Sequence, residues 1–383
     1  TGNAGTILEK HLSLSKAKDG EFSLGSPSYW RKYIYNNSAN IFGGSAPAGI
    51  TTTSFSSGYT LSSDIGWDQN AQGIDFAATG ATTLTLGGGK NYDGNSDATV
   101  AGSFQVTLAG LVAGYELFED NNLYSADFLL MGSGNHTKET VQSLANKLIS
   151  VAEIRKDSVA FISPNRGAFL SDGSAGTVTV YSDSQITDNV ISFYSPISSS
   201  SYAVFDSGYK YMYDRFNNEF VFVPTNSDVA GLMARTSLVA YPWFSPAGQQ
   251  RGLINNAIKL AYNPTKDQRD QLYPQRINSV ITKPGVGTLL FGDKTALSFA
   301  SAFDRINVRR LFLTVEQALE SAAEAQLFEL NDELTRANFR NIVEPYLRDV
   351  EAKRGIYGFL VVCDTTNNTP DVIDNNEFRA DIF

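Results

Sequence analysis

The sequence has very little cysteine and histidine. Its 383 residues include one cysteine, Cys363, and two histidines, His11 and His136. One cysteine excludes a disulfide within the chain. Cys363 lies in an apolar run, which indicates a buried and inert thiol. One cysteine and two widely separated histidines are also too few for a zinc site.

Long hydrophobic runs and an excess of basic residues are absent too. No apolar run approaches the roughly 18 residues of a membrane-spanning helix, so no membrane insertion is expected. Lys and Arg number 30 against 40 Asp and Glu, a net charge of −10. This balance argues against direct nucleic-acid binding, which needs basic surface. The first residues do not look like a signal peptide and include no Met, so an internal fragment is expected.

Composition divides the chain into three regions. Residues 1–110 are rich in Gly, Ser, Thr and Asn, and short alternating runs such as 82–86 predict a β-rich, variable region with long loops. Residues 111–283 carry an α/β pattern. Lys283-Pro284-Gly285 is interpreted as a boundary, and residues 284–383 as a smaller α+β domain that ends in a shortened strand.

The middle region begins with a strand–helix–strand pattern. Residues 126–131 and 158–163 are predicted as buried strands. Between them, apolar positions from Val141 to Ala152 follow helical spacing, with Thr137 as the N-cap. Such a unit implies parallel strands and a right-handed crossover.

Further elements are expected along the chain. Asp206-Ser-Gly208 is predicted as the turn of a hairpin, and Pro345 as a kink or restart of a helix. Gly355 is expected to take a left-handed conformation at the end of that helix. Predicted strands span 202–205, 209–213, 219–223, 288–291 and 357–363, and predicted helices span 227–235, 246–260, 266–272 and two segments within 304–354.

A catalytic site finds little support. His136 follows Gly134 at a strand–helix junction, a place that often carries active-site groups in α/β folds. A solvated loop histidine and a catalytic base both remain open. No Gly-x-Ser-x-Gly elbow is present, since Ser174 lacks the flanking spacing.

Phosphate and metal motifs also fail. Gly87-Gly-Gly-Lys90 lacks the first glycine and the final Ser or Thr of a P-loop, so a turn is favoured. Asp93 to Asp97 alternates oxygen ligands, but Ala98 and Gln105 stand where a calcium loop needs Gly and Glu. No cofactor is predicted.

Two charged clusters stand out. The first surrounds a predicted helix start and consists of Asp304, Arg305, Arg309 and Arg310. Arg305 and Arg309 are expected on one face of the helix, and Asp304 at its N-terminus. An intramolecular salt-bridge face and a subunit interface both remain open.

The second cluster is a polar loop from residue 364 to 377. Asp364, Asp371, Asp374 and Glu377 can cap backbone N–H groups and fix the loop. Calcium binding and pairing with a neighbouring subunit are the alternatives.

Six stretches of the chain form an ordered set of motifs: Asp228-Val-Ala-Gly-Leu-Met-Ala-Arg235, Trp243-Phe-Ser-Pro-Ala-Gly248, Leu289-Leu-Phe-Gly-Asp-Lys-Thr-Ala296, Phe303-Asp-Arg-Ile-Asn-Val-Arg-Arg-Leu-Phe312, Leu327-Phe-Glu-Leu-Asn331 and Val361-Val-Cys-Asp-Thr-Thr-Asn-Asn-Thr-Pro370. Together they resemble the contractile tail sheath proteins of bacteriophages, most closely those of T4-like myoviruses. The resemblance is strong from about residue 120 onward and weak before it.

The resemblance implies a subtilisin-like α/β domain without a catalytic triad, an outer variable region and a C-terminal domain facing the tail tube. It implies hexameric rings stacked as a helical sheath that contracts to drive the tube through the host envelope. Implied partners are further copies of the chain, the tail tube, the baseplate and the tail terminator. The virion is the implied location, after assembly in the host cytoplasm. The arms that join neighbouring subunits in this family are expected to be missing.

Three alternatives compete with that interpretation. One is a serine hydrolase that uses His136. Another is a module that binds host glycans through the first 110 residues. The third is a sheath from a type VI secretion system or a phage-tail-like bacteriocin.

Overall fold

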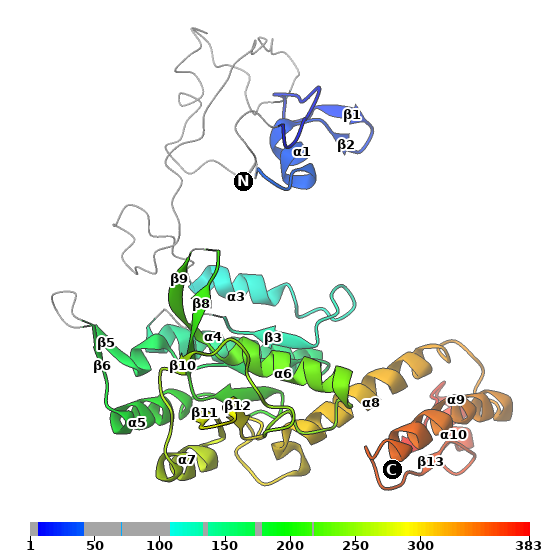
Figure 1. Ribbon diagram of the computed structural model, residues 1–383. Helices are drawn as coiled ribbons and strands as arrows, with labels where there is room; N and C mark the ends of the chain where they lie inside the picture. Colours follow the sequence, from blue (N-terminus) through cyan, green and yellow to red (C-terminus); the bar gives the residue numbers. More distant parts are fainter. Residues whose placement is uncertain (1–6, 42–69, 71–107, 133–136, 173–177, 217) are drawn as a thin grey trace. The chain divides into compact units, whose positions relative to one another are not determined.

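The computed structural model describes residues 7–41, 70, 108–132, 137–172, 178–216 and 218–383 (Figure 1). The chain divides into two units, Thr1–Gly89 and Lys90–Phe383. In the first unit, strands β1 (Glu21–Ser23) and β2 (Ser26–Pro27) form an antiparallel pair before helix α1 (Trp30–Asn37). The strand predicted at 82–86 lies outside the described residues.

The second unit is built on a five-stranded sheet in the order β12-β11-β7-β4-β3. Four neighbouring strands are parallel, and only β12 runs antiparallel to its neighbour. The strands are β3 (Phe128–Leu130), β4 (Val159–Ile162), β7 (Ala203–Asp206), β11 (Ile277–Lys283) and β12 (Gly287–Phe291).

The predicted strand–helix–strand unit is confirmed. Helix α4 (Lys138–Arg155) joins β3 to the parallel strand β4, and the Thr137 hydroxyl accepts the Thr140 backbone N–H at 3.4 Å. A second helix before β7, α5 (Asp183–Tyr194), was not predicted. Ser182 and Gln185 form a capping box there, a signal that the sequence carried.

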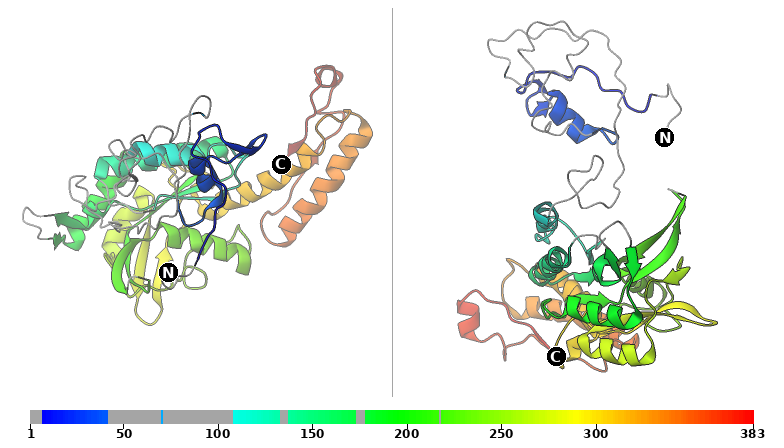
Figure 2. Two further views of the ribbon diagram at one scale, coloured as in Figure 1. Left: turned by 90° about the horizontal axis from the view of Figure 1, so that it is seen from above. Right: turned by 90° about the vertical axis from the view of Figure 1, so that its left-hand side faces the viewer.

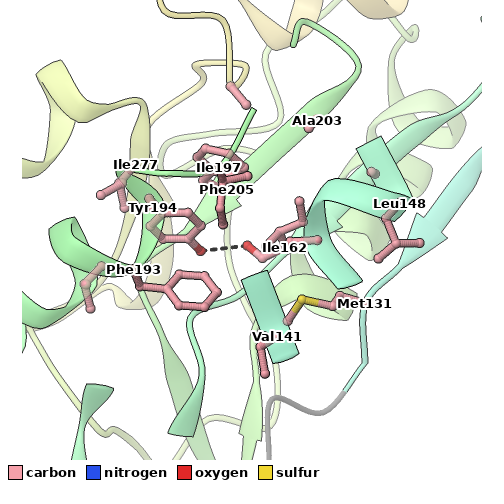
Figure 3. Close-up of a cluster of buried hydrophobic side chains, with 14 of the residues drawn as sticks. Met131, Val141, Leu148, Ile162, Phe193, Tyr194, Ile197, Ala203, Phe205 and Ile277 are labelled. Carbon is pink, nitrogen blue, oxygen red and sulfur yellow. Dashed lines mark hydrogen bonds between the residues drawn. The ribbon is translucent and has the colours of Figure 1, made fainter. Parts of the chain in front are cut away.

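Helices cover both faces of the sheet. Side chains from α3 (Leu108–Glu116), α4, α5 and α7 (Lys266–Leu272) pack on one face. Helices α6 (Asn226–Val239) and α8 (Ile306–Glu324) pack on the other. Figure 3 shows the first core, where the Tyr194 ring stacks on Phe205 and its hydroxyl donates to the Ile162 carbonyl at 2.8 Å. The result is a three-layer α/β body.

The hairpin predicted around residues 206–208 is wrong. Strand β7 lies in the main sheet, whereas β8 (Tyr209–Asp214) belongs to a separate sheet with β9 (Glu219–Pro224) and β10 (Lys259–Leu260). The Asp206 carboxylate accepts the Gly208 N–H at 2.9 Å inside the protein, so the turn passes the chain from one sheet to the other.

The helix predicted at 246–260 is also wrong. Backbone groups of this segment bond to β12 instead: the Gly248 N–H donates to the Leu290 carbonyl, and the Leu290 N–H donates to the Gly252 carbonyl. Gly248 has φ +87°, which a helix does not allow. Strand β11, which lies between β12 and β7 in the sheet, was not predicted. The predicted boundary after Lys283 falls in the turn between β11 and β12.

The C-terminal helices form an antiparallel pair, α8 and α9 (Glu333–Ala352) (Figures 1 and 2). Phe339, Val343 and Leu347 are buried as predicted. Helix α9 continues through Pro345, so the helix does not restart there. Residues before and after the proline pack into one cluster. The left-handed residue at its end is Arg354, with φ +65°, and not Gly355.

The strand predicted at 357–363 shortens to β13 (Val361–Val362), paired with β14 (Asp381–Ile382). Helix α10 (Pro370–Asp374) lies between them. Near the first core, β5 (Leu170–Asp172) pairs with β6 (Val178–Val180). The described residues also include three single-turn 3₁₀ segments, Arg166–Ala168, Tyr273–Gln275 and Ala302–Asp304. Within the described residues, no helix has the length and apolarity to cross a membrane.

Candidate functional site

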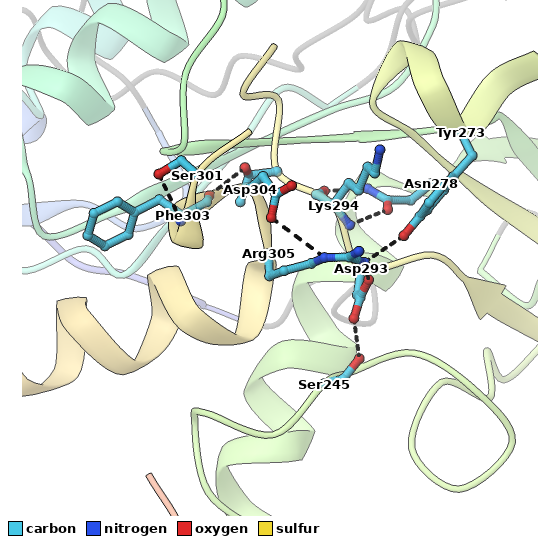
Figure 4. A network of polar contacts seen from close by, with 10 residues as sticks. Ser245, Tyr273, Asn278, Asp293, Lys294, Ser301, Phe303, Asp304 and Arg305 are labelled. Atoms are coloured by element: carbon cyan, nitrogen blue, oxygen red, sulfur yellow. Dashed lines mark hydrogen bonds and ion pairs between the residues drawn. The ribbon is translucent and has the colours of Figure 1, made fainter. Parts of the chain in front are cut away.

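The first charged cluster lies where α8 begins beside the sheet. The helix begins at Ile306, so Asp304 and Arg305 precede it instead of belonging to it. The Arg305 guanidinium donates to Asp293 Oδ1 at 2.7 Å and to the Tyr273 hydroxyl at 2.6 Å (Figure 4). These contacts raise the pKa of Arg305, with Asp293 as the main cause. A permanent cation therefore links α8 to the edge of the body.

Arg309 points inward. Its guanidinium donates to Ser201 Oγ at 2.6 Å and lies 4.3 Å from the ring centre of Tyr202 and 4.0 Å from that of Phe303. Ile306, the first residue of α8, is also buried. Burial lowers the pKa of Arg309. Its contacts hold α8 to the body by cation–π and hydrogen bonding.

Arg310 binds a different helix. It donates to Ser237 Oγ on α6 at 2.9 Å and lies 4.8 Å above the Phe128 ring. Of the three arginines, Arg305 has the most exposed side chain, at 43%. A contact with a neighbouring subunit requires such exposure. The cluster therefore has clear intramolecular partners, and its role between subunits stays a prediction.

The acidic loop is fixed by its own side chains, as predicted. Asp364 Oδ1 accepts the Thr366 hydroxyl at 2.5 Å and the Thr366 backbone N–H at 2.8 Å, and these bonds, the hydroxyl's first, lower the pKa of Asp364. The buried Asn368 amide both accepts from and donates to the Arg379 backbone. Glu377 pairs with Arg379 at 2.6 Å. The other two carboxylates of the predicted cluster, Asp371 and Asp374, are exposed on the surface.

A buried carboxylate at the carboxyl edge of the sheet escaped the sequence analysis. Asp206 Oδ2 accepts the Ser163 hydroxyl at 2.6 Å, and Oδ1 accepts the Thr225 hydroxyl at 2.8 Å. Burial raises the pKa of Asp206 to about 7 despite these bonds. The available signal was Ser163 at the end of one predicted strand and Asp206 directly after another, since the carboxyl ends of parallel strands meet at one edge.

The same body carries a surface hollow of about 590 Å³. Tyr273 and Phe291 give it apolar walls, and Lys266 and Arg269 give it a basic rim. Asp293 also lines it, so the hollow adjoins the Arg305 cluster. No local sequence pattern predicts this hollow, because its walls come from separate segments.

Three predicted groups lie outside the described residues: His136, the 87–90 turn and the 93–97 turn. His11 is described, and its ring bonds Glu9 at 3.2 Å. Among the described residues, no group of three or more His, Cys, Asp or Glu side chains is placed to hold a metal ion.

The fold and its charged surfaces define the class: an α/β body whose polar groups serve packing and surface contact. Two family models match the chain in succession. The phage tail sheath protein central domain matches residues 114–296, and the phage tail sheath C-terminal domain matches residues 299–382. The chain belongs to the phage tail sheath protein family.

Its relatives support this assignment. The tail sheath protein of Enterobacteria phage T4 is 37% identical over 333 residues, 83% of this chain and 49% of the relative. That of Vibrio phage KVP40 is 38% identical over 312 residues, 78% of this chain and 45% of the relative. The chain thus spans about half the length of these relatives.

Solved structures share the fold. The baseplate of the anti-feeding prophage gives a TM-score of 0.56 at 16% identity, covering 73% of this chain and 70% of that chain. The contracted sheath complex of PVC, an extracellular contractile injection system, gives a TM-score of 0.52 at 18% identity, covering 70% of each chain.

Proposed function

We propose that the chain is a structural subunit of a contractile phage tail sheath. Copies polymerise as stacked hexameric rings around the tail tube, and the sheath contracts to drive the tube through the host envelope. The observation that carries this proposal is the succession of two sheath domains over residues 114–296 and 299–382. Contraction requires two packings of the same subunits that differ in free energy.

The proposed partners are further copies of the chain, the tail tube protein, the baseplate and the tail terminator. The proposed location is the phage tail of the virion, after assembly in the host cytoplasm. In this arrangement residues 1–110 belong to the outer part, residues 111–283 form a subtilisin-like body, and residues 284–383 face the tube.

The body acts without catalysis in this proposal. Ser163 and Asp206 meet at the carboxyl edge of the sheet, where an α/β enzyme often keeps reactive groups. Both side chains are buried and hydrogen-bonded to each other, so no substrate reaches the Ser163 hydroxyl. Their geometry supports a role in holding the edge together.

We assign subunit or tube contacts to the outer parts of the two charged clusters. Arg305 is the most open of the first cluster, beside Asp304, while Arg309 and Arg310 support it from within. Asp371 and Asp374 are the open carboxylates of the second cluster, with Asp364 and Glu377 shaping the loop. Rearrangeable polar contacts suit a lattice that changes its packing.

A sheath of a related contractile injection system is the second candidate. The anti-feeding prophage and PVC structures share the fold of this chain, and at 16–18% identity that likeness shows the fold alone. Identity of 37–38% to phage sheaths supports the phage assignment more strongly. Purified particles separate the two, since a phage sheath is joined to a DNA-filled head.

Negative-stain electron microscopy tests the proposal. We expect striated cylinders, formed by the chain alone or on added tail tubes. Monomers under all ionic conditions, with no incorporation into tails, would contradict it. A fluorophosphonate probe tests the hydrolase alternative: labelling that disappears in His136→Ala would overturn a purely structural role.

A further inference from the structure

The tip of the α8–α9 hairpin exposes an unusual amount of apolar surface. Leu327, Phe328, Leu330 and Leu334, here called the apolar tip, are all more than 60% exposed, and Phe328 is fully exposed. Phe328 also has φ +70°, a left-handed conformation that is strained for an aromatic residue. The ring is open to solvent, and no described residue covers it.

The exposed charge around the apolar tip is acidic, and the nearest basic side chain, Arg336, is buried and bonds to Asn331. Glu324, Glu329 and Glu333 are exposed, and no Lys or Arg occurs between Thr314 and Thr335. Among the described residues, none of these three carboxylates has an ion-pair partner. The tip is thus an aromatic side chain surrounded by negative charge.

The hollow on the body has the opposite character. Its apolar walls, Tyr273 and Phe291, offer ring contacts to an inserted side chain. Lys266, Arg269 and the neighbouring Lys294 supply positive charge, and none of them pairs with a carboxylate in the described part of the chain. The lining also holds two carboxylates, Asp270 and Asp293, and Arg305 pairs with Asp293, so basic side chains remain in excess. Arg269 lies over Phe291 and Lys294 over Tyr273, so the cations frame the aromatic walls.

The tip of a molecule does not reach its own hollow. Arg305, which precedes α8, contacts Tyr273 and Asp293 in the wall of the hollow. The tip follows the other end of α8, and this helix has 19 residues, about 28 Å at 1.5 Å per residue. A packed helix does not fold back over that length, so an occupant of the hollow comes from another molecule.

We propose that the apolar tip of one copy inserts Phe328 into the hollow of a second copy, with Glu329 and Glu333 facing Lys266 and Arg269. Tip and hollow are different surfaces, so the contact is head-to-tail and leaves a free tip and a free hollow at the ends. Such contacts build rings or helical polymers. This inference rests on the proposed self-assembly and identifies one contact within it.

Cross-linking between two variants tests the contact directly. The native thiol, Cys363, is buried, so an introduced cysteine is the only accessible one in the described part of the chain. Glu329→Cys and Arg269→Cys proteins are mixed and treated with a short bis-maleimide. We expect covalent dimers in the mixture and few in either protein alone.

Matched controls define specificity. Glu351→Cys carries an exposed carboxylate position at the far end of α9 and should cross-link poorly to Arg269→Cys. Phe328→Ala added to the Glu329→Cys protein should reduce the yield about tenfold, the order expected for a buried aromatic anchor. Leu238→Ala, at another exposed apolar position, should leave it unchanged.

The result separates this contact from the proposed function. Cylinders of the unmodified chain without the 329–269 cross-link would overturn the inference and leave the sheath assignment intact. Cross-linking of position 329 to tail tube protein, with none to position 269, would overturn it too. If the unmodified chain never assembles, the proposed function is overturned. In that case the inference is still tested separately, and a missing 329–269 cross-link at the highest soluble concentration overturns it.

Discussion

The sheet body and the α8–α9 hairpin dispose of their apolar side chains in opposite ways. Every residue of β4 and of β7 is buried, and helices cover both faces of their sheet. The hairpin buries one stripe around Phe339, Val343 and Leu347. Its tip leaves Phe328 and Leu330 in solvent.

The difference indicates where each region gains its stability. A sheet enclosed by helices completes its core within one chain. The tip of the helical pair leaves apolar side chains exposed, and exposed apolar patches mark contact sites, so the proposed contact would complete its burial against another molecule. In the proposed sheath, the body is therefore the part whose core is complete within one chain, and the hairpin is the part expected to contact neighbours.

The largest expected effect comes from the body. Phe161, on β4, is buried and packs edge-on against Phe128. Phe161→Ala should lower the free energy of unfolding by about 3–5 kcal/mol, through lost burial and a cavity. Chemical denaturation followed by far-UV circular dichroism measures it. A loss below about 1 kcal/mol would show that the body is loosely packed and the contrast with the hairpin false.

The next effect concerns Asp206 and pH. Burial raises the pKa of Asp206 to about 7 in the folded protein, above the ordinary value of 3.8, with nearby Asp228 adding slightly. The folded state thus holds the proton more tightly than the unfolded state. Its contribution to stability is full below pH 4 and is lost as pH rises towards 7. A shift of this size corresponds to about 4 kcal/mol.

Asp206→Asn provides the control, because an amide does not titrate. The variant should show a flatter dependence of unfolding free energy on pH between 4 and 7 than the original chain. Equal slopes for both proteins would mean that the three hydrogen bonds to Asp206 outweigh its burial.

Phe161 and Asp206 also show what the sequence could predict. The apolar run around Phe161 and the helical spacing after Thr137 are local signals, so the βαβ unit was predicted correctly. Asp206 looked like a turn residue, since Asp-Ser-Gly is typical of hairpins. Its actual partners, Ser163 and Thr225, lie far away in sequence, and no local pattern reveals them.

The charged clusters repeat this lesson. The acidic loop was predicted well, because Asp364 binds Thr366 two residues away. The inward position of Arg309 depends on Ser201 and Tyr202, which contact it only after α8 packs on the sheet. The helix prediction for residues 246–260 was wrong for the same reason, because the backbone of this segment pairs with the distant strand β12.

A smaller effect is expected where the hairpin meets the body. The Trp243 indole N–H donates to the Lys353 carbonyl at the end of α9, at 3.0 Å. Trp243→Phe should weaken this contact by about 1 kcal/mol, the typical worth of one hydrogen bond. Hydrogen exchange should become several-fold faster in the last turn of α9 and remain unchanged in β4.

Tyr241→Phe is the matched variant, because it keeps the ring that stacks on Trp243. It should exchange like the original chain. Faster exchange throughout the sheet in Trp243→Phe would indicate that hairpin and body unfold together, which contradicts the division between them.

The smallest effect on stability is expected at the tip. Phe328→Gly removes an exposed ring and relieves a left-handed φ, at the cost of a more flexible unfolded chain. The free energy of unfolding should therefore stay the same or rise by up to about 1 kcal/mol, measured by chemical denaturation. The same variant should lose self-assembly, measured by sedimentation, because the ring that fills the neighbouring hollow is gone. Since the core is untouched, a loss of both stability and assembly would show that Phe328 supports the hairpin itself instead of a second molecule.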